Sequence, residues 1–262
     1  MTGVSGALTI LAVSAVWIAA LQTAAFAAGI RLGRVNVVDV IWGPGFAGIG
    51  LIAAVLGGGG PVRRVVLAVA VAVWGVRLAV NMHLKTRGHG EDPRYTDYLG
   101  AHPGRRIVAV KVFGVQGLSQ LWVGLPLIVA AVEPDPRGWR WAVFGIGVAV
   151  YLTGLGFETI GDRQLAVYRA DPGRPPVLDT GLWAWTRHPN YFGDACVWWG
   201  IWLIAATCGA AWFTVLSPIA MTYFLVYATG ARRLEQLMSR RPAYREYQRR
   251  TAYFVPRPPS RS

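Results

Sequence analysis

The stretch Thr186–Ala206, TRHPNYFGDACVWWGIWLIAA, joins a polar segment to a tryptophan-rich apolar run. Pro189 suits the first turn of a helix, where its missing N–H would have no partner, so the sequence predicts a helix that begins near Pro189. Arg187 and His188 then lie just outside it. A helix N-terminus favours an anion, and Arg187 adds a forked donor for phosphate or carboxylate. The same residues could also be only a polar helix start at the membrane interface.

The composition of the whole chain is that of an integral membrane protein. Of its 262 residues, 54% are hydrophobic and 15% charged, and the mean hydropathy is +0.39. The net charge of +13 could indicate a nucleic-acid partner, but the arginines lie mostly in loops between apolar blocks, as the positive-inside rule expects. We therefore expect no nucleic-acid partner. Since the four histidines form no multi-histidine cluster, we also expect no metal.

Seven apolar blocks approach the length of about 20 residues that a membrane helix needs. The first has no basic residue before it and is too long for a signal-peptide core, so it is expected to be a span. We predict a single all-α membrane domain over residues 1–262, with a polar tail at 231–262 and spans at 4–29, 35–56, 65–82, 112–132, 139–160, 192–207 and 210–230.

The charged loops predict how the chain crosses the membrane. The arginine-bearing segments Lys85–Lys111, Asp162–Arg187 and the tail from Arg232 fall on one side if there are seven spans. The opposite loops carry few cations, with Arg63–Arg64 as the exception. The positive-inside rule then places the N-terminus outside and the C-terminus in the cytoplasm, in the inner (plasma) membrane of the cell.

Two pairs of polar residues lie near the cytoplasmic ends of the fifth and sixth spans. Glu158 and Asp162 are four residues apart, and so are Asn190 and Asp194, so each pair shares one helical face. Ionisable residues within a span usually face a bundle interior or a watery cavity. Asp162 could instead be an interfacial residue paired with a neighbouring arginine.

Asp39 is the most isolated acid in any predicted span. It precedes a Gly-Pro-Gly sequence, where proline frees backbone groups and kinks the helix. A carboxyl in so dry a place could stay protonated and act as a hydrogen-bond donor. The alternative is a structural pair with Asn81 or Arg77 of the third span.

Polar residues continue from the third span into the loop that follows. Arg77, Asn81 and Lys85 recur every four residues and form one stripe on a helix. Arg87, Arg94 and Tyr95 follow in a glycine-broken loop, which could cradle a polyphosphate. Positive-inside topology alone could also account for about half of these cations.

The tail, ARRLEQLMSRRPAYREYQRR, is an arginine-rich amphipathic stretch punctuated by Glu235, Tyr244 and Tyr247. It could be a membrane-surface helix that binds anionic lipid. It could equally cover a cofactor site from the cytoplasmic side.

These motifs resemble a known family from about Asn36 to Pro256. The stretches VDVIWGPG, WGVRLAVNMHLKTRGHGEDPRY, FETIGDRQLAVYR, GLWAWTRHPNYFGD and YREYQRR resemble the bacterial DUF1295 branch of the steroid 5α-reductase-like membrane enzymes. The RHPNYFG element and a following Glu…Tyr…Tyr tail are also similar to isoprenylcysteine carboxyl methyltransferases and sterol C14 reductases.

The resemblance implies a seven-helix bundle with NADPH in a cytoplasm-facing cavity. It implies an oxidoreductase that transfers a hydride to the C=C bond of an apolar enone-like lipid or 3-oxo-steroid-like substrate, which enters from the bilayer. An S-adenosylmethionine-dependent membrane methyltransferase is the alternative. Apart from substrate and cofactor, membrane lipids are the expected partners.

The resemblance also assigns residues to roles. Asp162 and Arg169 match cofactor-holding residues, and Asp39 matches the acid that polarises the substrate. The tyrosine partner of that acid has no match on the third span, which offers Asn81 and His83 as further catalytic candidates, and no tyrosine occurs before Tyr95. The full set expected at the cofactor is Arg87, Arg94, Tyr95, Glu158, Asp162, Arg169, Arg187, His188, Asn190, Tyr191, Gly193, Asp194, Glu235, Tyr244, Tyr247 and Arg250.

Overall fold

The computed structural model describes residues 1–100, 103–228 and 230–259. Across these ranges every regular element is a helix and no strand occurs, which confirms the all-α class. Thr229 of the expected seventh span and residues 260–262 of the expected tail lie outside the described residues.

Within the described part of the chain, six helices are long and apolar enough to cross a membrane, as expected of a multi-pass membrane protein. They are Gly3–Leu32, Val37–Leu56, Pro61–Thr86, Arg105–Ala130, Arg140–Ala170 and Gly209–Met238, and each contains most of one expected span. The expected sixth span forms the 18-residue helix Pro189–Ala206, which is not among the six. Asn190 and Asp194 make its first turns polar. The count of seven spans and their orientation stay predictions.

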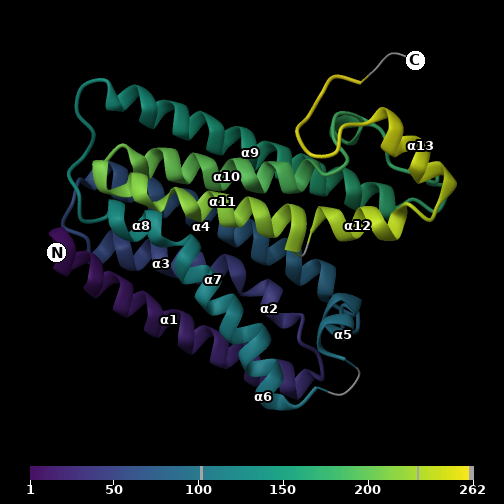
Figure 1. Ribbon diagram of the computed structural model, residues 1–262, viewed down its shortest axis with the longest axis horizontal. Helices are drawn as coiled ribbons and strands as arrows, with labels where there is room; N and C mark the ends of the chain where they lie inside the picture. Colours follow the sequence, from purple (N-terminus) through teal and green to yellow (C-terminus); the bar gives the residue numbers. More distant parts are fainter. Residues whose placement is uncertain (101–102, 229, 260–262) are drawn as a thin grey trace. The chain divides into compact units, whose positions relative to one another are not determined.

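The chain divides into two compact units. Unit 1 comprises Met1–Gly145 and Ile201–Ser217, and unit 2 comprises Ile146–Gly200 and Pro218–Ser262. The division falls within helices α9, α10 and α11, and the expectation of a single domain stays a prediction. In chain order the elements are α1 (Gly3–Leu32), α2 (Val37–Val40), α3 (Trp42–Leu56), α4 (Pro61–Thr86), α5 (Pro93–Leu99), α6 (Arg105–Val108), the π-helix η1 (Ala109–Gly114), α7 (Val115–Val123), α8 (Leu125–Ala130), α9 (Arg140–Ala170), the 3₁₀-helix η2 (Gly181–Ala184), α10 (Pro189–Ala206), the 3₁₀-helix η3 (Gly209–Val215), α11 (Leu216–Tyr223), the π-helix η4 (Phe224–Ala228), α12 (Ala231–Met238) and α13 (Pro242–Arg250) (Figure 1).

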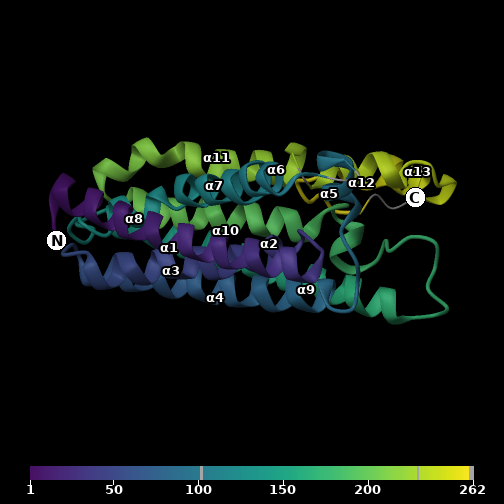
Figure 2. The same cartoon turned by 90° about the horizontal axis from the view of Figure 1, so that it is seen from below.

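Unit 1 is built on the close pairing of α3 with α4, which lie side by side (Figure 2). Their backbones meet at two glycines. A Cβ atom on Gly43 would lie 1.9 Å from the carbonyl oxygen of Gly75, so only glycine fits at this crossing. Phe46 of α3 and Trp74 of α4 are fully buried beside the crossing, and their rings are 5.8 Å apart. This packing fixes α3 and, with it, the short helix α2 that carries Asp39.

The second expected span breaks earlier than its proline. The helix is interrupted at Ile41, between α2 and α3, and Pro44 falls in the first turn of α3. Backbone N–H groups in a first helical turn have no intrahelical acceptor, so a proline there removes no hydrogen bond. The break therefore separates the turn that carries Asp39 from the helix that packs on α4.

The exception to the charge pattern has a structural explanation. Arg63 is fully buried near the start of α4. Its guanidinium donates to the carbonyl oxygens of Ala130 at 3.1 Å and Glu133 at 2.7 Å, and Asp135 accepts from the first backbone N–H groups of α4. Arg63 thus acts as an internal link between chain segments, whereas the positive-inside rule concerns solvated loop charges.

Unit 2 contains a second pair of helices in backbone contact, the part of α9 from Ile146 onward and the part of α10 up to Gly200. A Cβ atom on Gly193 would lie 2.5 Å from the backbone nitrogen of Glu158, and one on Gly200 would lie 2.5 Å from that of Tyr151. α10 begins at Pro189, as the sequence predicts. After α10 the chain continues through the 3₁₀-helix η3 before α11 starts.

Replacing Gly43 with alanine tests the α3–α4 crossing. We expect Gly43→Ala to destabilise the protein by about 1–3 kcal/mol, since overpacking forces the two backbones apart. The midpoint of thermal unfolding in detergent measures this. Gly145→Ala is the matched control, because a Cβ there meets nothing within 4 Å. Equal midpoints for both variants would contradict the close crossing.

Candidate functional site

The first polar centre, which we call the Asp39 cluster, lies in unit 1 and consists of Asp39, Arg94, Tyr95 and Gln116. The Tyr95 hydroxyl donates to Oδ1 of Asp39 at 2.7 Å, and Nη2 of Arg94 lies 3.1 Å from Oδ2. The Asp39 side chain is 19% exposed. Both oxygens of this carboxyl group are therefore hydrogen-bond acceptors.

The sequence GHGEDPRY (Gly88–Tyr95) explains how Arg94 and Tyr95 reach Asp39. Glu91 accepts hydrogen bonds from the backbone N–H groups of Val35 and Asn36, just before α2. Asp92 then caps α5 by accepting from the backbone of Arg94 at 2.8 Å, and it also binds the guanidinium. The loop is thus held against the start of α2, and Arg94 is oriented between two acids.

The direction of the hydrogen bonds at Tyr95 follows from an indole. The Trp42 ring N–H can only donate, and its partner is Oε1 of Gln116. The amide nitrogen of Gln116 must then face Tyr95, and it donates to the hydroxyl oxygen at 3.2 Å. Because this oxygen accepts from Gln116, the Tyr95 proton is directed to Asp39.

Burial raises the pKa of the Tyr95 hydroxyl, and the neighbouring Asp39 raises it further. Tyr95 therefore stays protonated at neutral pH and remains a donor. Burial alone would lower the pKa of Arg94, but its hydrogen bond to Asp92 and the charge of Asp39 outweigh this effect and raise the pKa. The Asp39 cluster thus combines a protonated hydroxyl with a permanent cation.

The two other catalytic candidates, Asn81 and His83, lie on α4. Asn81 is half-buried, and the His83 side chain is exposed near the end of the helix. Neither contributes to the hydrogen bonds described for Asp39, and neither does Arg87, which is exposed. The structure thus brings Asp39 together with Arg94 and Tyr95, two residues that the sequence had placed at the cofactor.

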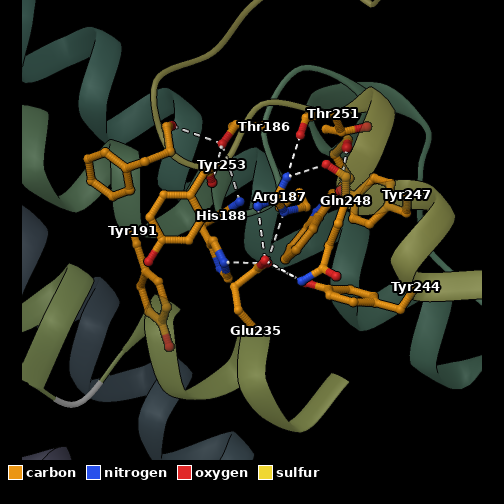
Figure 3. A network of polar contacts seen from close by, with 12 residues as sticks. Thr186, Arg187, His188, Tyr191, Glu235, Tyr244, Tyr247, Gln248, Thr251 and Tyr253 are labelled. Atoms are coloured by element: carbon orange, nitrogen blue, oxygen red, sulfur yellow. Dashed lines mark hydrogen bonds and ion pairs between the residues drawn. The ribbon is translucent and has the colours of Figure 1, made fainter. Parts of the chain in front are cut away.

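The second polar centre, which we call the Glu235 clasp, lies in unit 2 and joins the loop before α10 to the tail (Figure 3). Nε and Nη2 of Arg187 bind the two carboxylate oxygens of Glu235, both at 2.9 Å. The Tyr244 hydroxyl donates to Glu235 at 2.7 Å, Gln248 donates at 2.7 Å, and Nε2 of His188 lies 3.1 Å away. A buried carboxylate is thereby fully surrounded by donors.

The clasp extends into the segment after α13. Nη1 of Arg187 donates to the carbonyl oxygens of Gln248 and Thr251, and Tyr253 lies against its guanidinium at 5.4 Å. Tyr247 is 1% exposed and donates to the carbonyl oxygen of Trp183 at 2.5 Å. Burial raises the pKa of Tyr244, and the hydrogen bond to Glu235 raises it further, so its hydroxyl remains a donor.

These contacts give Arg187 and His188 a structural role. At least four of the five N–H groups of Arg187 are directed at protein acceptors. His188 is 2% exposed, and its ring stacks on Tyr191 with the centroids 5.7 Å apart. The sequence predicts that Arg187 and His188 contact the cofactor, and this contact stays a prediction.

The remaining expected cofactor residues of unit 2 lie along α9 and α10. The Asn190 side-chain amide donates to Asp162 at 3.2 Å, and both residues are half-buried. Glu158 and Asp194 are buried, at 4% and 7% exposure. Arg169 is exposed at the end of α9. Arg250 pairs with Asp179, which ties α13 to the loop before η2.

Sequence reasoning missed the glutamines. Gln116 orients Tyr95, and Gln120 donates to the carbonyl oxygen of Trp42 at 3.1 Å while accepting from Gln22 of α1 at 2.8 Å. The signal was present, because Gln116 and Gln120 are four residues apart in an apolar span and share a face. Gln248, which completes the clasp, gives no such signal in a polar tail.

Replacing Glu235 with glutamine tests the clasp. Removing one charge from a buried ion pair costs about 3–5 kcal/mol, so we expect α13 to open more often. Hydrogen–deuterium exchange of the α13 amides should become faster in Glu235→Gln. The matched control is Glu246→Gln, because Glu246 lies on the same tail and is exposed. Unchanged exchange in Glu235→Gln would mean that the ion pair does not hold the tail.

Comparison with known proteins gives the family of the chain. The profile of the DUF1295 family, described as a protein of unknown function, matches residues 25–251. An uncharacterised protein of Schizosaccharomyces pombe is 24% identical over 227 residues, which cover 74% of this chain and 64% of that relative. No solved structure matches the chain. Because the profile covers most of its length, the chain belongs to the DUF1295 family.

Proposed function

We propose that the protein is an NADPH-dependent membrane reductase that acts on the C=C bond of an apolar, enone-like lipid or 3-oxo-steroid-like substrate. The observation that carries this proposal is the hydrogen bond from Tyr95 to Asp39. An acid with a tyrosine partner is the pair that the resemblance assigns to polarising the substrate. The α4 helix lacks that tyrosine, and Tyr95 takes its place from α5.

In this proposal the Tyr95 hydroxyl turns its one proton from Asp39 to the carbonyl oxygen of the substrate when the substrate binds. Asp39 orients the hydroxyl, in place of the expected role as a neutral donor, because its oxygens already accept from Tyr95 and Arg94. Arg94 stabilises the negative charge that develops on the substrate oxygen when the C=C electrons move toward it. Bound NADPH would supply the hydride that adds to the β-carbon, and the resulting enolate would take a proton from the solvent at its α-carbon.

Residues of unit 2 fit the chemistry of the cofactor. A dinucleotide phosphate needs cations for its phosphates and polar side chains for its hydroxyl and amide groups. Arg169 is an exposed cation, and the half-buried pair Asp162 and Asn190 offers both donors and acceptors. We assign these three residues to the cofactor and leave Arg187 to the clasp. We further propose that the protein lies in the inner membrane with its tail in the cytoplasm, as the charged loops predict.

Calorimetry on the purified protein in detergent tests the cofactor. We expect NADPH to bind more tightly than NADH, and Arg169→Ala to weaken NADPH binding about 10- to 100-fold, as the loss of a charged hydrogen bond would. Arg245→Ala, an exposed arginine of α13, should leave the affinity unchanged. If the protein binds S-adenosylmethionine and neither nicotinamide cofactor, the reductase proposal is wrong and the methyltransferase alternative is favoured.

Substitutions at the Asp39 cluster test the hydrogen-bond donor to the substrate carbonyl. We expect Tyr95→Phe and Asp39→Asn to keep the NADPH affinity and to lower turnover by about 10²–10⁴, the usual contribution of a positioned acid. NADPH oxidation with a 3-oxo-4-ene steroid as the probe measures turnover. His83→Gln should leave turnover unchanged. Loss of NADPH affinity in Asp39→Asn would show that Asp39 lies in the cofactor site and not in the substrate site.

A further inference from the structure

A surface hollow on α12 lies outside the two polar centres. It measures about 440 Å³ and is lined by Arg233, Gln236, Leu237 and Arg240. These residues recur at intervals of three and four, so they form one face of the helix and its continuation. The opposite face carries two buried residues, Ala231 and Glu235, and Glu235 belongs to the clasp. α12 is therefore held by its inner face, while the half-buried Arg233 and the exposed Leu237 and Arg240 line the hollow.

Apolar surface accompanies these arginines. Leu234 and Leu237 are 42% and 55% exposed, which places a leucine ridge beside the arginine face of α12. An exposed leucine ridge beside arginines is the pattern of a helix that lies in a membrane interface, with its apolar side toward the acyl chains. A site for a water-soluble anion does not require such a ridge.

The position of α12 at the end of the last candidate span also indicates that it lies at the membrane interface. The last candidate span, Gly209–Met238, ends in α12. Tyr223 and Tyr227 lie earlier in this span, are more than half exposed, and stack with their ring centroids 5.6 Å apart. Exposed tyrosines of membrane proteins concentrate at the headgroup level. The arginines that follow them then lie level with the lipid phosphates.

The charge of this region selects the kind of lipid. From Ala231 to Pro259 the chain has eight arginines and two glutamates. One of those glutamates, Glu235, is buried and bound to Arg187. Such an excess of cations favours lipids with a net negative charge over zwitterionic ones.

We propose that the hollow lined by Arg233, Gln236, Leu237 and Arg240 binds the phosphate headgroup of an anionic phospholipid of the surrounding membrane. The arginines contact the phosphate, and the leucine ridge meets the first part of the acyl chains. This site is independent of the proposed cofactor and substrate. It anchors α12, and therefore Glu235 and the clasp, to the membrane surface.

Native mass spectrometry of the full chain in neutral detergent tests the proposal. The protein is titrated with phosphatidylglycerol or phosphatidylcholine of identical acyl chains. We expect a clear preference for phosphatidylglycerol, and a loss of about 30-fold in its affinity in the double variant Arg233→Gln/Arg240→Gln. Arg245→Gln/Arg257→Gln is the matched control, since it removes two exposed arginines from the same tail. It should keep the preference.

Three outcomes would overturn the proposal. They are equal affinities of the wild-type protein for the two lipids, an unchanged preference in the double variant, and complete displacement of the lipid by glycerol 1-phosphate. The last would show a site for a water-soluble anion. Circular dichroism checks that the double variant keeps its helices. If it does not, Arg240→Gln alone, which lies beyond the end of α12, is expected to lose about 5-fold, and no loss would overturn the proposal.

Discussion

A charge removed from water costs several kcal/mol unless hydrogen-bond donors or an opposite charge meet it, and this constraint shapes both polar centres of the chain. Asp39 is met by Tyr95 and Arg94 in unit 1. Glu235 is met in unit 2 by five donor atoms, two from Arg187 and one each from His188, Tyr244 and Gln248. Each acid therefore holds together segments that are distant in the sequence. Asp39 connects α2 with α5, and Glu235 connects the loop before α10 with α12 and α13.

The two acids use their partners differently. The donors of the Glu235 clasp are directed at protein groups, which makes the clasp a structural link between the loop before α10 and the tail. In the Asp39 cluster the Tyr95 proton points to Asp39, and the orientation is set by Trp42 and Gln116. To donate to a substrate carbonyl, this hydroxyl would have to turn its one proton away from Asp39, whose charge Arg94 would then balance.

The apolar pattern and the start of α10 at Pro189 were predictable from the sequence, because block length and proline chemistry are local. The partners of Asp39 were not. Tyr95 lies 56 residues from Asp39, and it arrives through a loop held by Glu91, whose role depends on backbone groups before α2. Arg187 shows the same limit, because a forked donor at a helix start suits a phosphate as well as Glu235. The burial of Arg63 was also not predictable from hydropathy, because arginine is scored as a polar residue.

The mass of the small molecule that co-purifies with the protein tests directly whether it uses a nicotinamide cofactor. Protein extracted in mild detergent, washed and denatured should release NADP(H), and protein with Arg169→Ala should release much less. Release of S-adenosylmethionine or its demethylated product, with no nicotinamide, would show that the protein is not a nicotinamide-dependent reductase.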